Sequence, residues 1–313
     1  MDAYDLINWT RKYDFVTQQV QKLATRFAYN HILVPTHTSN PLVFRSQLRL
    51  DINRLIFQNR LTDKNQSVKV YTIGSVYKNE NEFHQLDLEY MNCKDIFALV
   101  ELLDFCDSLF KCLRVKNVKI HINDLSLAHE EDNLDEFIEL LNSFHIVNVV
   151  KDLTLEPKME CYQGIIFQLN TTSNSVLGYG GQYDSCNSNL VIDIENLIAI
   201  LDMYGFRYDQ TFDERFDRSG KITIIPKSND LGELSYILTY LKRNDTKVPK
   251  YTVDCDLSDR STIEKIEDAK QRYSGYYLVD SNENVSYYPF YTNTPFTRRT
   301  FQEILDGYNN TNS

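Results

Sequence analysis

Two polar side chains four residues apart, Gln85 and Glu89, have the types and spacing for binding a small polar ligand. Leu86, Leu88 and Tyr90 alternate with polar residues here, which predicts a strand. On a strand, residues i and i+4 share a face about 13 Å apart, so the pair can bracket a small zwitterion. A carboxylate accepts charge-assisted hydrogen bonds from an ammonium group, and a Gln amide can both donate and accept hydrogen bonds. The alternative is an exposed strand face that carries ordinary polar residues.

Two later segments contain further candidates, Leu155–Phe167 and Tyr179–Asp184. Tyr162 in the first is equally explained as a core aromatic, because the chain has 21 tyrosines. The pair Gly180-Gly181 in the second is by itself a weak signal, since paired glycines usually make a turn or a bulge. The sequence has no P-loop, no GxGxxG after a strand, no GxSxG and no HExxH. The interpretation therefore depends on the segments as a set.

As a set, these segments resemble the histidyl-tRNA synthetase family, in the version carried by the regulatory subunit of ATP phosphoribosyltransferase. Five segments occur in the family's order, and with the strand at Asn189 they cover most of residues 1–205. The last two are the most specific. The five segments are Leu48–Arg54, Tyr77–Glu80, Phe83–Glu89, Leu155–Phe167 and Tyr179–Asp184.

The resemblance implies a histidine pocket. In the family, the positions of Gln85 and Glu89 hold the amino group and ring of histidine, and the position of Tyr162 lines the ring. A run that holds the amino acid and ATP corresponds to Arg49, Asp51 and Asn53. The candidate histidine-binding residues are Asp51, Asn53, Lys78, Gln85, Glu89, Glu160 and Tyr162, with Gly180, Gly181 and Tyr183 expected at a turn of the pocket.

Several positions depart from the catalytic pattern of the family. Lys78 replaces an arginine, which keeps a point charge but loses the planar, bidentate grip on carboxylate or phosphate. Pro157 and Asn196 stand where the synthetases place arginines that act on ATP. Asp51 and Gln182 are further substitutions. Losing one arginine donor typically costs about 2 to 4 kcal/mol of transition-state stabilisation, so the loss of three, at Lys78, Pro157 and Asn196, predicts that no adenylate forms.

The resemblance and these departures together predict a noncatalytic regulatory subunit of ATP phosphoribosyltransferase, needed for the first step of histidine biosynthesis and its feedback inhibition. The implied partners are the short-form catalytic subunit and L-histidine as effector, around a homodimeric core and without a cofactor. One alternative is an enzyme, either a divergent histidyl-tRNA synthetase or another amino-acid-activating ligase. A second is a synthetase-like accessory module that binds nucleic acid or a protein partner.

The predicted fold class is α+β. We expect a class II aminoacyl-tRNA synthetase-like antiparallel sheet with flanking helices over residues 1–206, and a polar linker over 207–220. Strands alternate with helices over 221–313, which predicts a small, largely parallel α/β domain that resembles an anticodon-binding domain. Ser258 or Asp259 is predicted to cap a helix, and the tail from Asp306 to be frayed.

The hydrophobic periodicity predicts the following elements. Helices are expected at 12–29, 48–58, 95–113, 134–144, 195–204, 231–243 and 261–273. Strands are expected at 31–35, 67–78, 82–92, 116–123, 159–169, 176–180, 189–194, 221–226, 251–255 and 276–279.

Composition sets broader bounds. With 313 residues, 42% of them hydrophobic, the chain can bury two cores. No apolar run is long enough to cross a membrane and the first residues are too polar for a signal peptide, so a cytoplasmic protein is expected. A net charge of −11 weighs against nucleic acid as a partner. The six cysteines form no CxxC pair and no zinc-ligand spacing, which predicts reduced thiols and no metal site.

Overall fold

The computed structural model divides the chain into two compact units. The first comprises Met1–Ala24, Tyr29–Asp63 and Val68–Gln210, and the second comprises Thr25–Ala28, Lys64–Ser67 and Thr211–Ser313. Most of the predicted linker, residues 209–219, lies outside the described residues. The structure describes residues 3–34, 48–58, 66–78, 81–126, 131–172, 175–208, 220–244, 252–282, 284–290 and 297–312.

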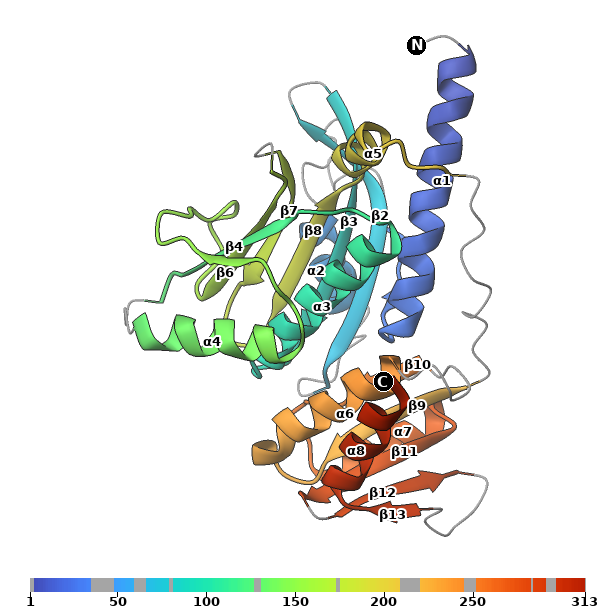
Figure 1. The fold of residues 1–313 in the computed structure, drawn as a ribbon, viewed down its shortest axis with the longest axis vertical. Helices are drawn as coiled ribbons and strands as arrows, with labels where there is room; N and C mark the ends of the chain where they lie inside the picture. The colour runs from blue at the N-terminus through green and yellow to red at the C-terminus, as the bar shows by residue number, and fades with distance from the viewer. Residues whose placement is uncertain are drawn as a thin grey trace. The chain divides into compact units, whose positions relative to one another are not determined.

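A sheet with eight strands in the described residues forms the centre of the first unit (Figure 1). The strand order is β1-β2-β3-β8-β7-β6-β4-β5. The outer pairs β1–β2 and β4–β5 are parallel, and the six strands from β2 to β4 pair antiparallel. The strands are β1 (Asn30–His31), β2 (Val68–Lys78), β3 (Asn81–Met91), β4 (Lys119–Asp124), β5 (Val149–Lys151), β6 (Ile165–Asn170), β7 (Val176–Gln182) and β8 (Ser188–Asp193).

Helices cover both faces of this sheet, α1 (Ala3–Arg26), α2 (Leu48–Gln58), α3 (Phe97–Cys112), α4 (Glu131–Ser143) and α5 (Ile194–Met203). The predicted bounds of α2 are confirmed. The first helix starts earlier and ends sooner than expected, because the chain turns at Ala28 with a positive φ of 62°. Asp193 caps α5, and its side chain accepts a hydrogen bond from the backbone N–H of Asn196 at 2.8 Å.

The alternation in β3 gives the sheet two different faces. We name the face with Gln85, Asp87 and Glu89 the acidic face, and the face with Leu86, Leu88 and Tyr90 the apolar face. Figure 1 shows α2 behind the sheet and α3 in front of it.

Side-chain contacts identify which helix covers which face. Ile52 of α2 packs in one cluster with Val70 and Met91, which share the acidic face with Glu89. Helix α3 covers the apolar face, because its Glu101 forms a buried ion pair at 2.7 Å with Lys69, whose strand partner is Tyr90.

One predicted strand is wrong at its start. The sequence predicts a strand over 159–169, but Met159–Gly164 forms turns and β6 begins only at Ile165. Met159 and Tyr162 are buried, so their apolar character reflects packing onto the sheet rather than a place within it. The predicted turn at Gly180 and Gly181 is also corrected, since both glycines lie inside β7.

The second unit contains a mixed sheet rather than a largely parallel one. Its strand order in the described residues is β10-β9-β11-β12-β13, in which β10, β9 and β11 are parallel and β12 and β13 are antiparallel additions that the sequence did not predict. The strands are β9 (Lys221–Pro226), β10 (Thr252–Cys255), β11 (Gly275–Ser281), β12 (Asn284–Pro289) and β13 (Thr297–Arg299). The helices are the short 3-10 turn η1 (Asn229–Leu231), α6 (Gly232–Asn244), α7 (Thr262–Arg272) and α8 (Phe301–Asn312).

Two local predictions in this unit are wrong. The cap of α7 is Ser261, which forms a capping box with Glu264, while the Ser258 hydroxyl donates to Asp256. The tail from Asp306, predicted to be frayed, continues α8. All the candidate site residues lie in the first unit.

Candidate functional site

The acidic face is built from β3 and its neighbour β8. The register places Glu89 opposite Asn189 and Gln85 opposite Asp193, and puts the side chains of each pair on the same face. Glu89 and Asn189 are fully buried and Asp87 is only 2% exposed. Gln85 and Glu89 therefore share one face, as predicted. The alternative, an exposed strand face, is wrong at Glu89, because this residue is buried.

Two tyrosine hydroxyls complete the buried part of this face. Tyr183 donates a short hydrogen bond to Glu89 Oε2, and Tyr162 donates to Asn189 Oδ1 at 2.8 Å. Burial, followed by nearby groups that include Asp87 and Glu89, raises the pKa of Tyr162 well above its usual range. Tyr162 therefore stays a neutral donor, which suits it to a site crowded with carboxylates. The hydroxyls of Tyr162 and Tyr183 thus already form hydrogen bonds with the polar groups that a ligand would need.

Tyr162 belongs to the segment 152–164, whose backbone is held by hydrogen bonds to neighbouring strands. The Asn123 side chain donates to the carbonyl groups of Leu153 and Leu155 at 3.4 and 3.1 Å, and Gln163 N–H donates to the Gln182 carbonyl at 3.1 Å. Met159 and Tyr162 then pack with the cluster of Ile166, Tyr183 and Val191. The segment is a cover over the acidic face, and its backbone is fixed to strands on either side.

The paired glycines contribute space rather than a turn. A Cβ atom on Gly180 would lie 2.2 Å from the Asn189 carbonyl oxygen and 2.4 Å from Phe167. Gly181 has φ of 156° and would meet the Ile165 carbonyl oxygen at 2.7 Å. Side chains at either position would separate β7 from its neighbours, so the two glycines let β8, with Asn189, lie close to β7.

The other predicted residues fall in different places. Glu160 is exposed, and Gln85 is half-buried on the acidic face. Asn53 is half-buried on α2, which covers this face, and its Oδ1 is buried with no hydrogen-bond partner among the described residues. The side chains of Asp51 and Lys78 lie outside the described part of the structure. The structure thus brings together Glu89, Tyr162 and Tyr183, and it leaves Glu160 at the surface.

Two members of the buried network were not predicted, Asp87 and Asn189. Asp87 had a signal in the sequence, because it lies midway between Gln85 and Glu89 in the same alternation. Asn189 had none, since only the register of β3 with β8 places it beside Glu89. Its Nδ2 is buried without an acceptor among the described residues, so it is a donor available to a ligand.

The positions that depart from the catalytic pattern are used for local structure. Asn196 is exposed in the first turn of α5, and its side chain donates to the Val176 carbonyl at 3.1 Å. Gln182 Oε1 accepts from the Ile165 N–H at 3.3 Å, and Pro157 is exposed in the segment 152–164. None of the three is a cation, so none can contact a phosphate as an arginine would.

The strand positions on the acidic face suit a cation better than an anion. Those of β3 and β8 include Asp87, Glu89 and Asp193 and no Lys or Arg. A polyphosphate on this face would meet carboxylates at short range, which is a repulsive arrangement. An ammonium or protonated imidazole would meet acceptors instead. The arrangement can therefore recognise an amino acid through its positive groups.

Solved structures of other proteins share this fold. The apo histidyl-tRNA synthetase of S. aureus has a TM-score of 0.58 at 16% identity, over 96% of this chain and 95% of that one. The chain has a class II aminoacyl-tRNA synthetase-like fold. The predicted fold class is thus confirmed, with a small mixed sheet in the second unit.

Two further structures agree with this synthetase-like fold. A Bacillus halodurans protein described as an ATP phosphoribosyltransferase regulatory subunit/histidyl-tRNA synthetase has a TM-score of 0.51 at 14% identity, covering 83% of this chain and 93% of that one. The histidyl-tRNA synthetase of Nostoc sp. has a TM-score of 0.51 at 10% identity, covering 95% and 96%.

Sequence comparison gives a shorter match. The chain is 23% identical over 113 residues to the chloroplastic histidine–tRNA ligase of Porphyra purpurea. This match covers 33% of the chain and 26% of the ligase, so the synthetase-like chain spans about a quarter of that relative. No protein-family profile matches the sequence. No helix in the described residues has the length and apolar character to cross a membrane.

Proposed function

We propose that this chain is a noncatalytic regulatory subunit of ATP phosphoribosyltransferase. In this role it would bind the short-form catalytic subunit and transmit feedback inhibition by free histidine in the first step of histidine biosynthesis. A homodimeric core is part of the proposal. The name of the Bacillus halodurans neighbour joins this role with that of a histidyl-tRNA synthetase.

The observation that carries the proposal is the charge of the acidic face. Adenylate formation needs cations at the α-phosphate, yet Pro157 and Asn196 carry none and Lys78 keeps only a point charge. The same face keeps the carboxylates and amides that an amino acid requires, among them Glu89 and Asn189. Loss of phosphate-binding groups with retention of amino-acid-binding groups favours a receptor over an enzyme.

The buried state of the face determines how the receptor would work. Tyr162 and Tyr183 already bond to Asn189 and Glu89, so histidine must displace them or shift the segment 152–164. That opening costs free energy, which lowers the apparent affinity of the chain by itself. A partner that favours the open arrangement restores affinity, and by linkage histidine then changes the stability or activity of the complex.

The main experiment is coexpression with a short-form catalytic subunit, followed by size-exclusion chromatography and an activity assay with and without histidine. We expect one comigrating complex whose activity depends on this chain and falls when histidine is added. By calorimetry, the chain alone should bind L-histidine weakly and the complex measurably. Failure of the two chains to comigrate refutes the proposed role.

Two matched variants separate sensing from assembly. Glu89→Gln and Glu160→Gln make the same chemical change, but the first carboxylate is buried in the network and the second is exposed. We expect Glu89→Gln to lose most of the response to histidine while the complex still forms, and Glu160→Gln to behave as the unmodified chain. An equal response in both variants would mean that the acidic face is not the sensor.

The competing proposal is a divergent histidyl-tRNA synthetase or another amino-acid-activating ligase, which the fold of the S. aureus and Nostoc structures favours. Histidine-dependent exchange of pyrophosphate into ATP tests it directly. We expect no exchange above the background of a protein-free control. Clear turnover would establish an enzyme and end the regulatory proposal. Salt-sensitive binding of RNA would instead support a nucleic-acid-binding module.

A further inference from the structure

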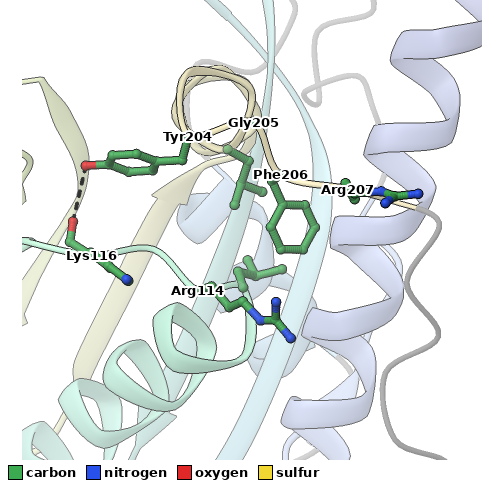
Figure 2. A pocket seen from close by; sticks show the side chains of 8 residues that line it. Arg114, Lys116, Tyr204, Gly205, Phe206 and Arg207 are labelled. Atoms are coloured by element: carbon green, nitrogen blue, oxygen red, sulfur yellow. Dashed lines mark hydrogen bonds between the residues drawn. The ribbon is translucent and has the colours of Figure 1, made fainter.

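A second candidate site lies away from the acidic face. A cavity of about 340 Å³ is located at the C-terminal ends of α3 and α5, and α3 covers the apolar face of the sheet. Figure 2 shows Tyr204 and Lys116 on one side and Phe206 with Arg114 and Arg207 on the other. The volume lies in the range of small-molecule sites. The lining residues are Leu113, Arg114, Lys116, Leu201, Tyr204, Gly205, Phe206 and Arg207.

The cavity wall is formed by two helix ends with the same left-handed turn. Arg114 follows α3 with φ of 55°, and Gly205 follows α5 with φ of 65°. Backbone N–H groups already cap both helices, for example Val115 to the Phe110 carbonyl and Phe206 to the Leu201 carbonyl, each at 2.9 Å. The basic side chains near these ends are therefore not needed to satisfy the last carbonyl groups.

The surfaces of the cavity are apolar and aromatic. Leu113 and Leu201 are buried, with at most 1% exposure, while Tyr204 is 49% exposed. The Phe206 ring is fixed by ring contacts with Phe15 and Tyr208 at 5.6 and 5.2 Å. A flat apolar group that enters here removes aromatic and aliphatic surface from water.

The charged groups at the cavity all have the same sign. Arg114, Lys116 and Arg207 line it, and none of the lining residues is an Asp or Glu. Arg114 and Lys116 have no ion-pair partner among the described residues, although the chain has a net charge of −11. The simpler explanation is that these cations are solvated and complement the dipoles of the two helix ends.

Two observations argue for more than that explanation. Arg114 occupies a left-handed position where glycine is preferred, and the equivalent position after α5 is indeed Gly205. A neighbouring hollow of about 630 Å³ along α1 has a different character: Asp14 lines it, and its Lys12 is paired with Asp202 at 2.7 Å. Arg11 and Arg207 also line that hollow, so the cavity at the ends of α3 and α5 differs from it in having basic lining residues and no acidic one.

We propose that this cavity binds a small organic anion with a flat apolar body. The body contacts Leu113, Leu201 and the rings of Tyr204 and Phe206, and the acidic group faces the cations Arg114 and Lys116. The ligand class is an aromatic carboxylate or a chemically similar acid. This site does not depend on the acidic face or on the regulatory role proposed above.

The test uses 8-anilinonaphthalene-1-sulfonate, a fluorescent aromatic anion, with the full chain. We expect saturable binding of one probe per chain, weakened by raising NaCl from about 0.05 to 0.5 M because salt screens the exposed cations. Lys116→Glu should weaken binding about tenfold, since it replaces an attraction by a repulsion. Lys22→Glu makes the same change at an exposed position of α1 outside the cavity and should leave binding unchanged.

Arg114→Gly removes the other cation without harming the helix end, because glycine prefers the left-handed turn. We expect weaker probe binding, by about fivefold, at an unchanged or higher thermal midpoint. Tyr204→Ala should also weaken binding, whereas Tyr162→Phe on the acidic face should not. The absence of saturable binding, or equal affinity in Lys116→Glu, Arg114→Gly and Lys22→Glu, overturns the proposal.

Discussion

The acidic face and the cavity beyond the apolar face place opposite charges in opposite surroundings. On the acidic face, Asp87 and Glu89 are almost wholly removed from solvent and hydrogen bonds within the chain accompany them. At the cavity, Arg114 and Lys116 are exposed beside apolar surface. Breaking a buried polar contact lowers the free energy of unfolding strongly, whereas changing an exposed charge alters it little.

This difference separates two kinds of candidate site. The acidic face has its polar groups ordered in advance but closed by Tyr162 and Tyr183, so a ligand must compete with the protein itself. The cavity is open, and a ligand competes there only with water. Variants of the buried polar groups on the acidic face should therefore change stability, and variants of the exposed cations at the cavity should change binding with little change in stability.

The largest effect is expected from the buried ion pair between Lys69 and Glu101 beneath the apolar face. Lys69→Met leaves the Glu101 carboxylate, 1% exposed, without its 2.7 Å partner. We expect a loss of about 3 to 5 kcal/mol in the free energy of unfolding, measured by urea denaturation. Lys111→Met, which breaks an exposed pair with Asp107, should cost less than about 1 kcal/mol. Similar losses in both variants would contradict the role assigned to burial.

The next effect concerns the close approach of β7 and β8 behind the acidic face. Gly180→Ala introduces a Cβ 2.2 Å from the Asn189 carbonyl oxygen, a backbone atom that cannot move alone. We expect a loss of about 2 to 3 kcal/mol in urea denaturation. Gly205→Ala at the cavity meets no atom within 4 Å and should cost only about 1 kcal/mol, for its left-handed backbone. Equal losses of stability in Gly180→Ala and Gly205→Ala would show that the close approach of β7 to β8 does not determine the effect at Gly180.

A smaller effect tests the closed network itself. Tyr162→Phe removes the hydroxyl that donates to Asn189 Oδ1 and leaves that buried oxygen without its donor. We expect a loss of about 1 to 2 kcal/mol in the free energy of unfolding. Tyr204→Phe removes a hydroxyl from an exposed ring with a 3.4 Å bond, and should change stability by less than about 0.5 kcal/mol. An unchanged free energy of unfolding in Tyr162→Phe would indicate that the hydrogen bond from Tyr162 to Asn189 does not close the acidic face.

The smallest effect is a pH dependence at the apolar face. The hydrogen bond that His84 Nδ1 donates to Glu195 Oε1 at 2.6 Å is the main cause of a raised pKa of His84, with Glu82 adding to it and burial opposing it. The rings of Trp9 and Tyr13 contact the same imidazole. Because the folded pKa is raised, the stabilisation is complete below the unfolded pKa of about 6.5 and is lost as the pH rises through the folded pKa.

Denaturation at a series of pH values measures this contribution. The unmodified chain should lose more stability than His84→Gln between about pH 6 and pH 8. The difference between the two curves should become constant at high pH, where His84 is neutral in both the folded and unfolded states. Parallel curves across the whole range would show that the bond to Glu195 is not linked to protonation.

The sequence predicted the parts of the fold in which one periodicity dominates. Helix α2 was predicted at its exact bounds because Leu48, Ile52 and Ile56 repeat at helical spacing. The strand over Met159–Gly164 was wrong because buried apolar residues in a turn look the same as those in a strand. Strands β12 and β13 were missed because nothing local showed where the chain returns to the sheet.

The candidate site shows the same division. The alternation of β3 by itself determined that Gln85 and Glu89 share a face, and the missing arginines determined that the chain lacks the usual groups for gripping ATP. Only the tertiary structure decided that Glu89 meets Asn189 and Tyr183, and that Arg114 meets Phe206 at a cavity. Local spacing fixes which way a side chain points, whereas strand register and helix packing, which join residues distant in the chain, fix what it touches.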